Sequence, residues 1–407
     1  MNSIEIITHI MELVAGVGVY MIACSMISTN LEAVSSDRLK KLLSKVSKNK
    51  LVGVAIGALA TIIIQSSGAT TVMTIGFVNA GIISLSQAAT LIFGGEIGTT
   101  ITGQIVALGL FNGGIIDITI LFSAMAGIGV FINMFAKKDN TRYIGDIISG
   151  FGLLFIGLSM MSDSMNSFAM MPELKMFLSR IDNILILVIA GALITAAIHS
   201  SSAMTSIAIT MVAARLISLE QGIYITLGAN IGTCFTGALA AMSSSANAKR
   251  TSLIQLIFNA GGVVLLLVSD VVIKLVTNNT FSYGIMFERM FPDTPQIQLA
   301  MFHTFFNIAS VLIVLPLSDQ LVKLSQRLVA DDKGSEETER FHFVDEHMLS
   351  TPSIAVSQVK KEIINMAKIA NDNFNIAIDI ITSQDYKYLE NFRTVTGSDY
   401  EDKIKGY

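Results

Sequence analysis

The chain has 407 residues, of which 52% are hydrophobic and only 14% are charged, and its net charge is -4. Soluble globular chains are typically about 25% charged, so the composition excludes an ordinary water-soluble domain. The mean hydropathy of +0.63 indicates a protein that crosses a membrane several times. The weak negative charge, with no long basic stretch outside one short loop, argues against nucleic acid as a partner. Two cysteines, Cys24 and Cys234, lie in apolar segments and cannot supply a disulfide framework.

The first apolar run covers residues 13–27. It lacks the charged start and the small-residue cleavage site of a signal peptide, so we expect it to remain in the protein as a membrane helix. Further runs along the chain are long enough to cross a hydrocarbon core about 30 Å thick. We predict these spans at about residues 86–110, 114–136, 144–163, 221–243, 251–276 and 297–317.

The sequence repeats itself. Residues 18–103 align with residues 152–237 at a constant offset of 134 and without a gap. The alignment pairs Ser, Thr, Gly and Gln, whereas chance similarity between membrane segments would pair mostly Leu and Ile. Gln65-Ser66-Ser67-Gly68-Ala69, for example, stands opposite His199-Ser200-Ser201-Ser202-Ala203. The pattern predicts an internal duplication.

The basic loops predict the orientation of the two halves. Residues 36–50 contain six Lys and Arg, which places them on the cytoplasmic side. Their counterpart, residues 163–183, balances two basic residues against three acidic ones, so we expect it outside. Two homologous halves with opposite loop charge form an inverted-topology repeat, which many secondary transporters use for alternating access.

Each half contains a segment too short to cross the membrane. Only 14 residues, 51–64, separate the basic loop from the first polar tip. As a helix they would span about 21 Å, less than the hydrocarbon core of about 30 Å. The sequence therefore predicts a re-entrant hairpin at residues 51–82, entering from the cytoplasm, and its mirror image at residues 185–216, entering from outside.

We place the first transmembrane repeat at residues 1–143 and the second at residues 144–326. A polar linker follows at residues 327–351. In residues 352–407 apolar side chains recur at helical spacing beside charged ones, which predicts amphipathic cytoplasmic helices too small to bury a core alone. The expected fold class is an all-α membrane protein with two inverted-topology repeats, each with a re-entrant helical hairpin, and a short cytoplasmic helical tail.

The Ser-rich tips are candidates for an anion site. Irregular backbone at membrane depth must be buried or line a water-filled cavity, because its polar groups need partners. Where a broken helix restarts, its N–H groups and nearby hydroxyls suit a phosphate-like oxyanion. The alternative is that Ser and Gly only allow close helix packing. The candidate ligands are Gln65, Ser66, Ser67, Gly68, His199, Ser200, Ser201 and Ser202.

A second paired element follows each tip, at residues 94–100 and 228–234. Glycines on both sides of a polar residue predict a helix interruption, where freed carbonyls with Thr and Asn oxygens would coordinate a hard cation such as sodium. Glu96 is ionisable inside an apolar span, which marks it as functional. The alternative is a protonated carboxyl bonded to nearby backbone. The candidate coupling-ion ligands are Glu96, Thr99, Thr100, Asn230, Thr233, Thr71 and Thr205.

Other chemistry has little support. Two interpretations of His199 carry equal weight. In one it accepts a proton or donates to the substrate, and in the other it is a neutral imidazole that satisfies one carbonyl. His303 is typical of a helix-packing residue. The 21 methionines form no regular series with histidines, so we expect no transition-metal site. No GxSxG, P-loop, HExxH or CxxC motif occurs, so we expect neither an enzyme nor a cofactor.

At these residues the sequence resembles the type II sodium/phosphate cotransporter family, specifically its bacterial members with a helical PhoU-like tail. The tips at residues 65–68 and 199–202 resemble the family's Gln-Ser-Ser-Ser motif, and residues 94–99 and 228–233 resemble its Gly-Ala-Asn-Ile-Gly-Thr segment. The resemblance covers about residues 10–320. The sequence departs from the family pattern at three positions, where Gly68 replaces Ser, His199 replaces Gln and Glu96 replaces Asn.

The resemblance implies a multi-pass transporter of the cell (inner) membrane that moves inorganic phosphate with sodium by alternating access. Phosphate would lie between the tips, with sodium nearby as co-substrate, and the cytoplasmic tail would be the start of a PhoU-like bundle. A homodimer is left open. Our hypothesis is that Glu96 belongs to the coupling-ion site. The alternatives are another small anion, a proton-coupled variant of the same fold, and a phosphate sensor or scaffold that does not transport.

Overall fold

The computed structural model describes residues 3–43, 49–79, 81–110, 118–242, 244–278, 280–330, 343 and 352–382. Within these ranges the protein is built from helices and contains no strand, which confirms the all-α expectation. Six of the described helices are long and apolar enough to cross a membrane, and a seventh span results if one bent helix pair is counted. The protein is therefore a multi-pass membrane protein.

Two sets of helices carry the site. The first set consists of α1 (Ser3–Leu43), α2 (Lys50–Ile64), α3 (Ser67–Asn79) and α4 (Leu85–Gly109). The second set consists of α6 (Asp139–Ala169), α8 (Ile184–Ile198), α9 (Ser201–Ala213) and α10 (Leu219–Ala241). The other elements are α5 (Ile118–Phe135), α7 (Pro172–Ser179), α11 (Ala246–Val276), α12 (Tyr283–Met290), α13 (Pro295–Val314), the 3-10 turn η1 (Leu315–Leu317), α14 (Ser318–Leu328) and α15 (Pro352–Thr382).

The helix boundaries recur along the chain. Both ends of α2 and of α3, and the start of α4, reappear 134 residues later as the ends of α8 and α9 and the start of α10. Each set contains a break of two residues, at Gln65-Ser66 and at His199-Ser200. The 15 residues of α2, and the 15 of α8, measure about 22 Å as helix, too short to cross the membrane. The recurrence supports the predicted duplication, while its inverted topology stays a prediction.

Most predicted spans coincide with observed helices, but the connections differ. The expected outer loop at residues 163–183 contains the end of α6 and the whole of α7, and the loop after α11 contains α12. Hydropathy reports long spans and misses such short helices, although Pro172 at the start of α7 and the Ser282 cap of α12 are recognisable start signals. The side chains of residues 36–48 lie outside the described part of the chain.

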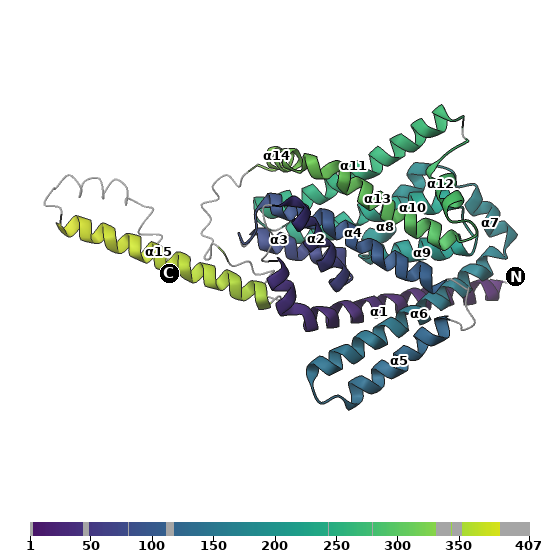
Figure 1. Ribbon diagram of the computed structural model, residues 1–407, viewed down its shortest axis with the longest axis horizontal. Coiled ribbons are helices and arrows are strands. Elements are labelled where there is room, and N and C mark those ends of the chain that lie inside the picture. The colour runs from purple at the N-terminus through teal and green to yellow at the C-terminus, as the bar shows by residue number, and fades with distance from the viewer. Residues whose placement is uncertain are drawn as a thin grey trace.

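The carboxyl-terminal region begins slightly later than predicted. Helix α14 ends at Leu328, two residues inside the expected linker at 327–351. The tail contains one described helix, α15, and the remainder of the predicted tail, residues 383–407, lies outside the described residues. In Figure 1 α15 extends away from the other helices.

The predicted helix interruption near Glu96 is wrong. Helix α4 runs from Leu85 to Gly109 without a break, and α10 does the same from Leu219 to Ala241. The glycines instead allow close packing, because a Cβ at Gly98 would lie 2.6 Å from the Ala58 carbonyl oxygen of α2. A Cβ at Gly232 would lie 2.5 Å from the Ala192 carbonyl oxygen of α8. Helix α2 therefore packs tightly on α4, and α8 on α10.

The two sets also interlock. Helix α3 of the first set packs against α10 of the second, and α9 packs against α4. Helix α1 lies along α6, and α5 lies on the other side of α6 as the outermost helix of the bundle (Figure 1). The largest apolar cluster joins α1, α6, α9, α10 and α13 through side chains such as Tyr20, Leu158, Ile209 and Phe302. This packing brings the two helix breaks near each other.

Substituting Gly98 tests the close packing. We expect Gly98→Val to destabilise the protein by about 1–3 kcal/mol, because the new side chain must displace backbone of α2. Gly261→Val is the matched control, since no heavy atom lies within 4 Å of a Cβ at that helical position. The measurement is the melting temperature of each purified variant in detergent, and equal melting temperatures would contradict the packing.

Candidate functional site

Both short helices end on a residue with a left-handed backbone. Gln65 closes α2 with φ 58°, and its N–H donates to the Thr61 carbonyl oxygen at 2.7 Å. His199 closes α8 with φ 53°. This conformation costs a residue other than glycine about 1–2 kcal/mol. Strain retained at two equivalent positions points to a functional constraint on the breaks.

The helices restart on serine. The Oγ of Ser66 accepts a hydrogen bond from the Ala69 N–H at 3.2 Å, and the Oγ of Ser200 accepts one from the Ala203 N–H at 3.2 Å. Because the Ser66 oxygen accepts from the backbone, its hydroxyl hydrogen remains available to a ligand. The Ser200 Oγ also lies 3.2 Å from the Ser202 Oγ, so one of these two hydroxyls donates to the other and the remaining hydrogen is available. The first N–H groups of α3 and α9 face the same breaks, so each restart offers donors to an anion.

Each break is tied to the long helix of its own set. Thr102 Oγ1 of α4 donates to Gln65 Oε1 at 3.1 Å, and Thr236 Oγ1 of α10 lies 3.5 Å from His199 Nδ1. Both pairs are 37 residues apart in the sequence. Gln65 Nε2 also donates to the Ile62 carbonyl oxygen at 2.6 Å. Both ends of the Gln65 amide are thus engaged within the protein, so Gln65 positions the break.

The two breaks border one cavity of about 270 Å³, called the tip cavity here. All eight predicted anion ligands line it, which unites side chains from α2, α3, α8 and α9. None of the 18 lining residues, all in the described part of the chain, is Lys, Arg, Asp or Glu. The further lining residues, which the sequence did not suggest, are Met21, Cys24, Ser25, Ser28, Thr29, Thr61, Thr102 and Ile198.

The predicted coupling-ion ligands are divided by the structure. Thr99 and Thr233 line the tip cavity, whereas the other five candidates do not. The hydroxyls of Thr99, Thr100 and Thr233 each donate to a carbonyl of their own helix, at 3.0, 2.8 and 3.1 Å. The seven residues therefore do not form one coordination shell. Thr71 and Thr205 are buried within the hairpin helices α3 and α9.

Glu96 lies buried between α4 and α11. Its Oε1 accepts hydrogen bonds from Gln255 Nε2 at 3.1 Å and Asn259 Nδ2 at 2.9 Å. The expected alternative, a carboxyl bonded to backbone, is wrong, because both partners are side-chain amides. The amide oxygens, Gln255 Oε1 and Asn259 Oδ1, are buried and have no hydrogen-bond partner among the described residues. Glu96, Gln255 and Asn259 thus form one buried polar cluster between α4 and α11.

The equivalent position in the second set, Asn230, has neutral partners. Its Oδ1 lies 3.2 Å from His303 Nε2, and its Nδ2 donates to Asn307 Oδ1 at 3.3 Å. Asn307 Nδ2 donates in turn to the His303 carbonyl oxygen at 3.0 Å. His303 therefore bridges α13 and α10, as a packing residue would. The i, i+4 spacing of Gln255 with Asn259, and of His303 with Asn307, was the available sequence signal for these partners.

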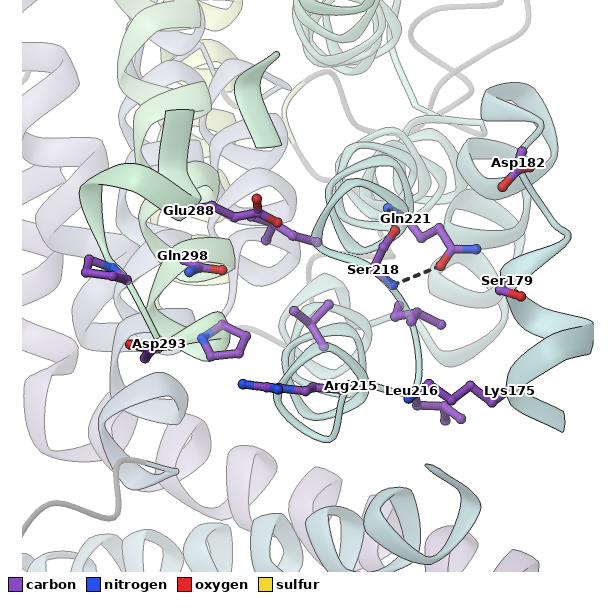
Figure 2. Close-up of a pocket in the computed structure, with 15 residues that line it drawn as sticks. Lys175, Ser179, Asp182, Arg215, Leu216, Ser218, Gln221, Glu288, Asp293 and Gln298 are labelled. Carbon is purple, nitrogen blue, oxygen red and sulfur yellow. Dashed lines mark hydrogen bonds between the residues drawn. The ribbon is translucent and has the colours of Figure 1, made fainter. Parts of the chain in front are cut away.

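A larger cavity of about 710 Å³ lies at the other end of α9, about 20 Å from the tip cavity by the length of that helix (Figure 2). Within it the Ser218 N–H donates to Gln221 Oε1 at 2.9 Å, which caps α10. It contains none of the predicted ligands, and its charges have both signs. The charged lining residues are Lys175, Arg215, Asp182, Glu288 and Asp293.

Apolar spans and two helix breaks that face a polar cavity, whose described lining contains no Lys, Arg, Asp or Glu, are features of a membrane transporter. The sequence profile of the Na+/Pi-cotransporter family matches residues 19–163 and 158–290, and the chain belongs to this family. The two matches begin in α1 and α6, the helices that open the two sets. Members of the family are transporters and not enzymes.

Curated relatives support the assignment. YqeW of Bacillus subtilis, an uncharacterized protein, is 28% identical over 311 residues, which cover 76% of this chain and 95% of YqeW. YjbB of Escherichia coli, whose name describes a candidate inorganic phosphate export protein, is 23% identical over 359 residues. That match covers 88% of this chain but only 62% of YjbB, less than two thirds of its length.

The human sodium-dependent phosphate transport protein 2B is 38% identical over 65 residues, which are 16% of this chain and 9% of that protein. No solved structure matches the chain. The resemblance of the tail to a PhoU-like bundle stays a prediction.

Thr102→Val tests whether α4 holds the first break. The substitution keeps the shape of the side chain but leaves Gln65 Oε1 without its donor, which we expect to destabilise the protein by about 1–3 kcal/mol. Thr8→Val is the control, because Thr8 is exposed and its hydroxyl bonds to the Ile4 carbonyl oxygen of its own helix. Thermal unfolding in detergent provides the comparison, and a Thr102→Val protein as stable as the control would show that this bond does not hold the break.

Proposed function

We propose that the protein is a secondary transporter of the cell membrane that carries inorganic phosphate together with sodium by alternating access. One observation supports this above all: the two Ser-rich breaks border a single cavity without a fixed charge. Hydroxyls and helix N-termini suit an oxyanion, and they release it more readily than an arginine clamp would. A transporter needs this balance of capture and release.

The lack of charge in the tip cavity supports coupling to a cation. Burying an anion without a compensating charge is expensive in a low-dielectric site. Because the lining residues supply no positive charge, a cation that binds nearby would stabilise the bound anion. Phosphate affinity would then depend on that cation, which is the thermodynamic basis of symport.

The Glu96 position is our proposed cation site. Sodium is a hard cation that prefers oxygen ligands, and Glu96, Gln255 and Asn259 offer a carboxylate and two unpartnered amide oxygens. In the present arrangement the amides turn their NH₂ groups toward the carboxylate. A cation would reverse these two amides, so that their oxygens face it beside the carboxylate. Glu96 precedes Thr99 of the tip cavity by three residues, or about 4.5 Å along the helix.

Alternating access would use the two hairpins at residues 51–82 and 185–216, within the repeats at residues 1–143 and 144–326. The matching helix boundaries and the interlocked packing of α3 with α10 and of α9 with α4 support this proposal. With residues 36–50 in the cytoplasm, the tail would also be cytoplasmic. The names of the relatives mention both export and sodium-dependent transport, and a symporter works in either direction according to its gradients.

The tips can be tested by transport. We expect Ser66→Ala combined with Ser200→Ala to lower phosphate uptake into vesicles at least tenfold, because both hydroxyl donors are lost from the cavity. The assay is uptake of radiolabelled phosphate by the reconstituted full chain with an inward sodium gradient. Ser167→Ala is a suitable control, since Ser167 lies outside the tip cavity and its hydroxyl bonds to the Asp163 carbonyl oxygen of its own helix. Unchanged uptake by the double variant would overturn the assignment of the tips.

Glu96 can be tested by its effect on the driving ion. We expect Glu96→Gln and Glu96→Asn to raise the half-saturating sodium concentration at least tenfold, because Glu96 is the ionisable member of the proposed set Glu96, Gln255 and Asn259. The measurement is phosphate uptake across sodium concentration and pH. Glu220→Gln is the control, since Glu220 lies in the first turn of α10 and pairs with Lys274 at 3.3 Å.

The pattern of change identifies the ion. If the variants lose the pH dependence of uptake but keep its sodium dependence, the ion that binds at Glu96 is a proton and not sodium. If neither dependence changes, Glu96 lies outside the coupling site.

A further inference from the structure

One face of α1 lines the tip cavity. Five of its residues do so, at positions i, i+3, i+4, i+7 and i+8, which is a single helical face. We call this face the α1 stripe; its residues are Met21, Cys24, Ser25, Ser28 and Thr29. Three of the five carry hydroxyls, in a helix whose preceding turns are apolar. Since neither sequence motif includes α1, its presence in the cavity was not foreseen.

The stripe distinguishes α1 from its counterpart α6. At an offset of 134 the stripe corresponds to Phe155, Leu158, Ser159, Ser162 and Asp163, none of which lines the tip cavity. Phe155 and Leu158 are instead buried in the apolar core. The duplication therefore supplies two breaks but only one polar wall, and the cavity is asymmetric.

A buried hydrogen bond fixes the stripe against the second break. Tyr20 Oη lies 2.7 Å from Ser206 Oγ, and Ser206 Oγ donates to the Ser202 carbonyl oxygen at 2.7 Å. Because Ser206 uses its hydrogen on Ser202, Tyr20 is the donor. Tyr20 precedes Cys24 by one helical turn, so this bond places the stripe directly beside the Ser200–Ser202 tip.

The hydroxyls of the stripe differ from those of the tips. Ser66 and Ser200 already accept a backbone N–H. Ser25, Ser28 and Thr29 have no hydrogen-bond partner among the described residues, so their oxygens remain free to accept. Hydrogen phosphate can donate its own O–H to such an oxygen, whereas sulfate at neutral pH has no proton to donate and receives only the hydrogen bonds that the hydroxyls themselves donate.

We propose that the α1 stripe is the third wall of the anion site and that its hydroxyls select a protonated oxyanion, hydrogen phosphate, over sulfate. Ser25, Ser28 and Thr29 accept the proton of the bound anion while the two tips donate to its other oxygens. The choice of this anion rests on the proposed function. The contact with α1 is tested separately, by binding.

Cys24 reports directly on occupation of the cavity. In the purified full chain with saturating sodium, N-ethylmaleimide should modify Cys24, and mass spectrometry separates it from the buried Cys234. We expect phosphate to slow this modification at least tenfold and sulfate at the same concentration to have little effect. Cys24→Ala removes the signal and identifies the site.

Substitution of the hydroxyls tests the selection. Ser25→Ala, Ser28→Ala and Thr29→Val combined should raise the half-protecting phosphate concentration at least tenfold and abolish the preference over sulfate. The matched control, Ser159→Ala with Ser162→Ala in α6, should change neither. Ser28→Thr alone keeps the hydroxyl and should preserve both, which shows that packing changes are not responsible.

The outcomes separate this inference from transport. A triple variant that keeps both the half-protecting concentration and the preference would overturn the role of α1, even if the wild-type protein transports phosphate. If the wild-type protein transports none but phosphate still protects Cys24 in the expected pattern, the proposed function fails and the third wall stands.

Discussion

The need to satisfy broken helical backbone inside an apolar bundle is the constraint on which this structure depends. At Gln65-Ser66 and His199-Ser200 the chain leaves helical geometry, and lipid offers no partner for the polar groups that are freed. Serine side chains cap the helices that restart, and the left-handed residues contact threonines of α4 and α10. Glycines allow α2 and α8 to pack closely against these two helices. The same groups that satisfy the breaks form the walls of the tip cavity.

The distribution of charge follows from that arrangement. The tip cavity has donors but no fixed charge, and the nearby acidic side chain Glu96 lies within the bundle beside Gln255 and Asn259. In the second set the equivalent position is neutral, with Asn230 bonded to His303 and Asn307. The two sets of helices thus differ, with one acidic position at Glu96 and one neutral position at Asn230. In our proposal this difference between the two sets decides where the driving ion binds. A second difference is that α1 lines the tip cavity, whereas its counterpart α6 does not.

Local sequence patterns predicted the breaks well and the tertiary partners poorly. The start of α3 after Ser66 and of α9 after Ser200 followed from short apolar runs that end on polar residues, because such runs cannot cross a bilayer. The glycines around Glu96 were misinterpreted, since glycine serves an interrupted helix and a close helix contact equally well in a single sequence. Only the position of α2 against α4 distinguishes the two.

The partners of Glu96 could not be predicted for a different reason. Gln255 and Asn259 follow it by 159 and 163 residues, so their i, i+4 spacing relates them to each other but not to Glu96. The polar face of α1 was visible in the sequence as Ser25, Ser28 and Thr29, but its direction depends on packing against α6 and α9. Contacts between distant segments thus complete a site whose centre the motifs had identified.

The central claim is that the anion and the cation bind to adjacent sites and stabilise each other. Reciprocal binding to the purified full chain tests it most directly: radiolabelled phosphate with sodium or choline, and radiolabelled sodium with and without phosphate. Coupled sites require each ion to increase the affinity for the other by the same factor. We predict that sodium raises phosphate affinity at least tenfold and that phosphate raises sodium affinity equally. Phosphate binding of equal affinity in sodium and in choline would contradict the claim.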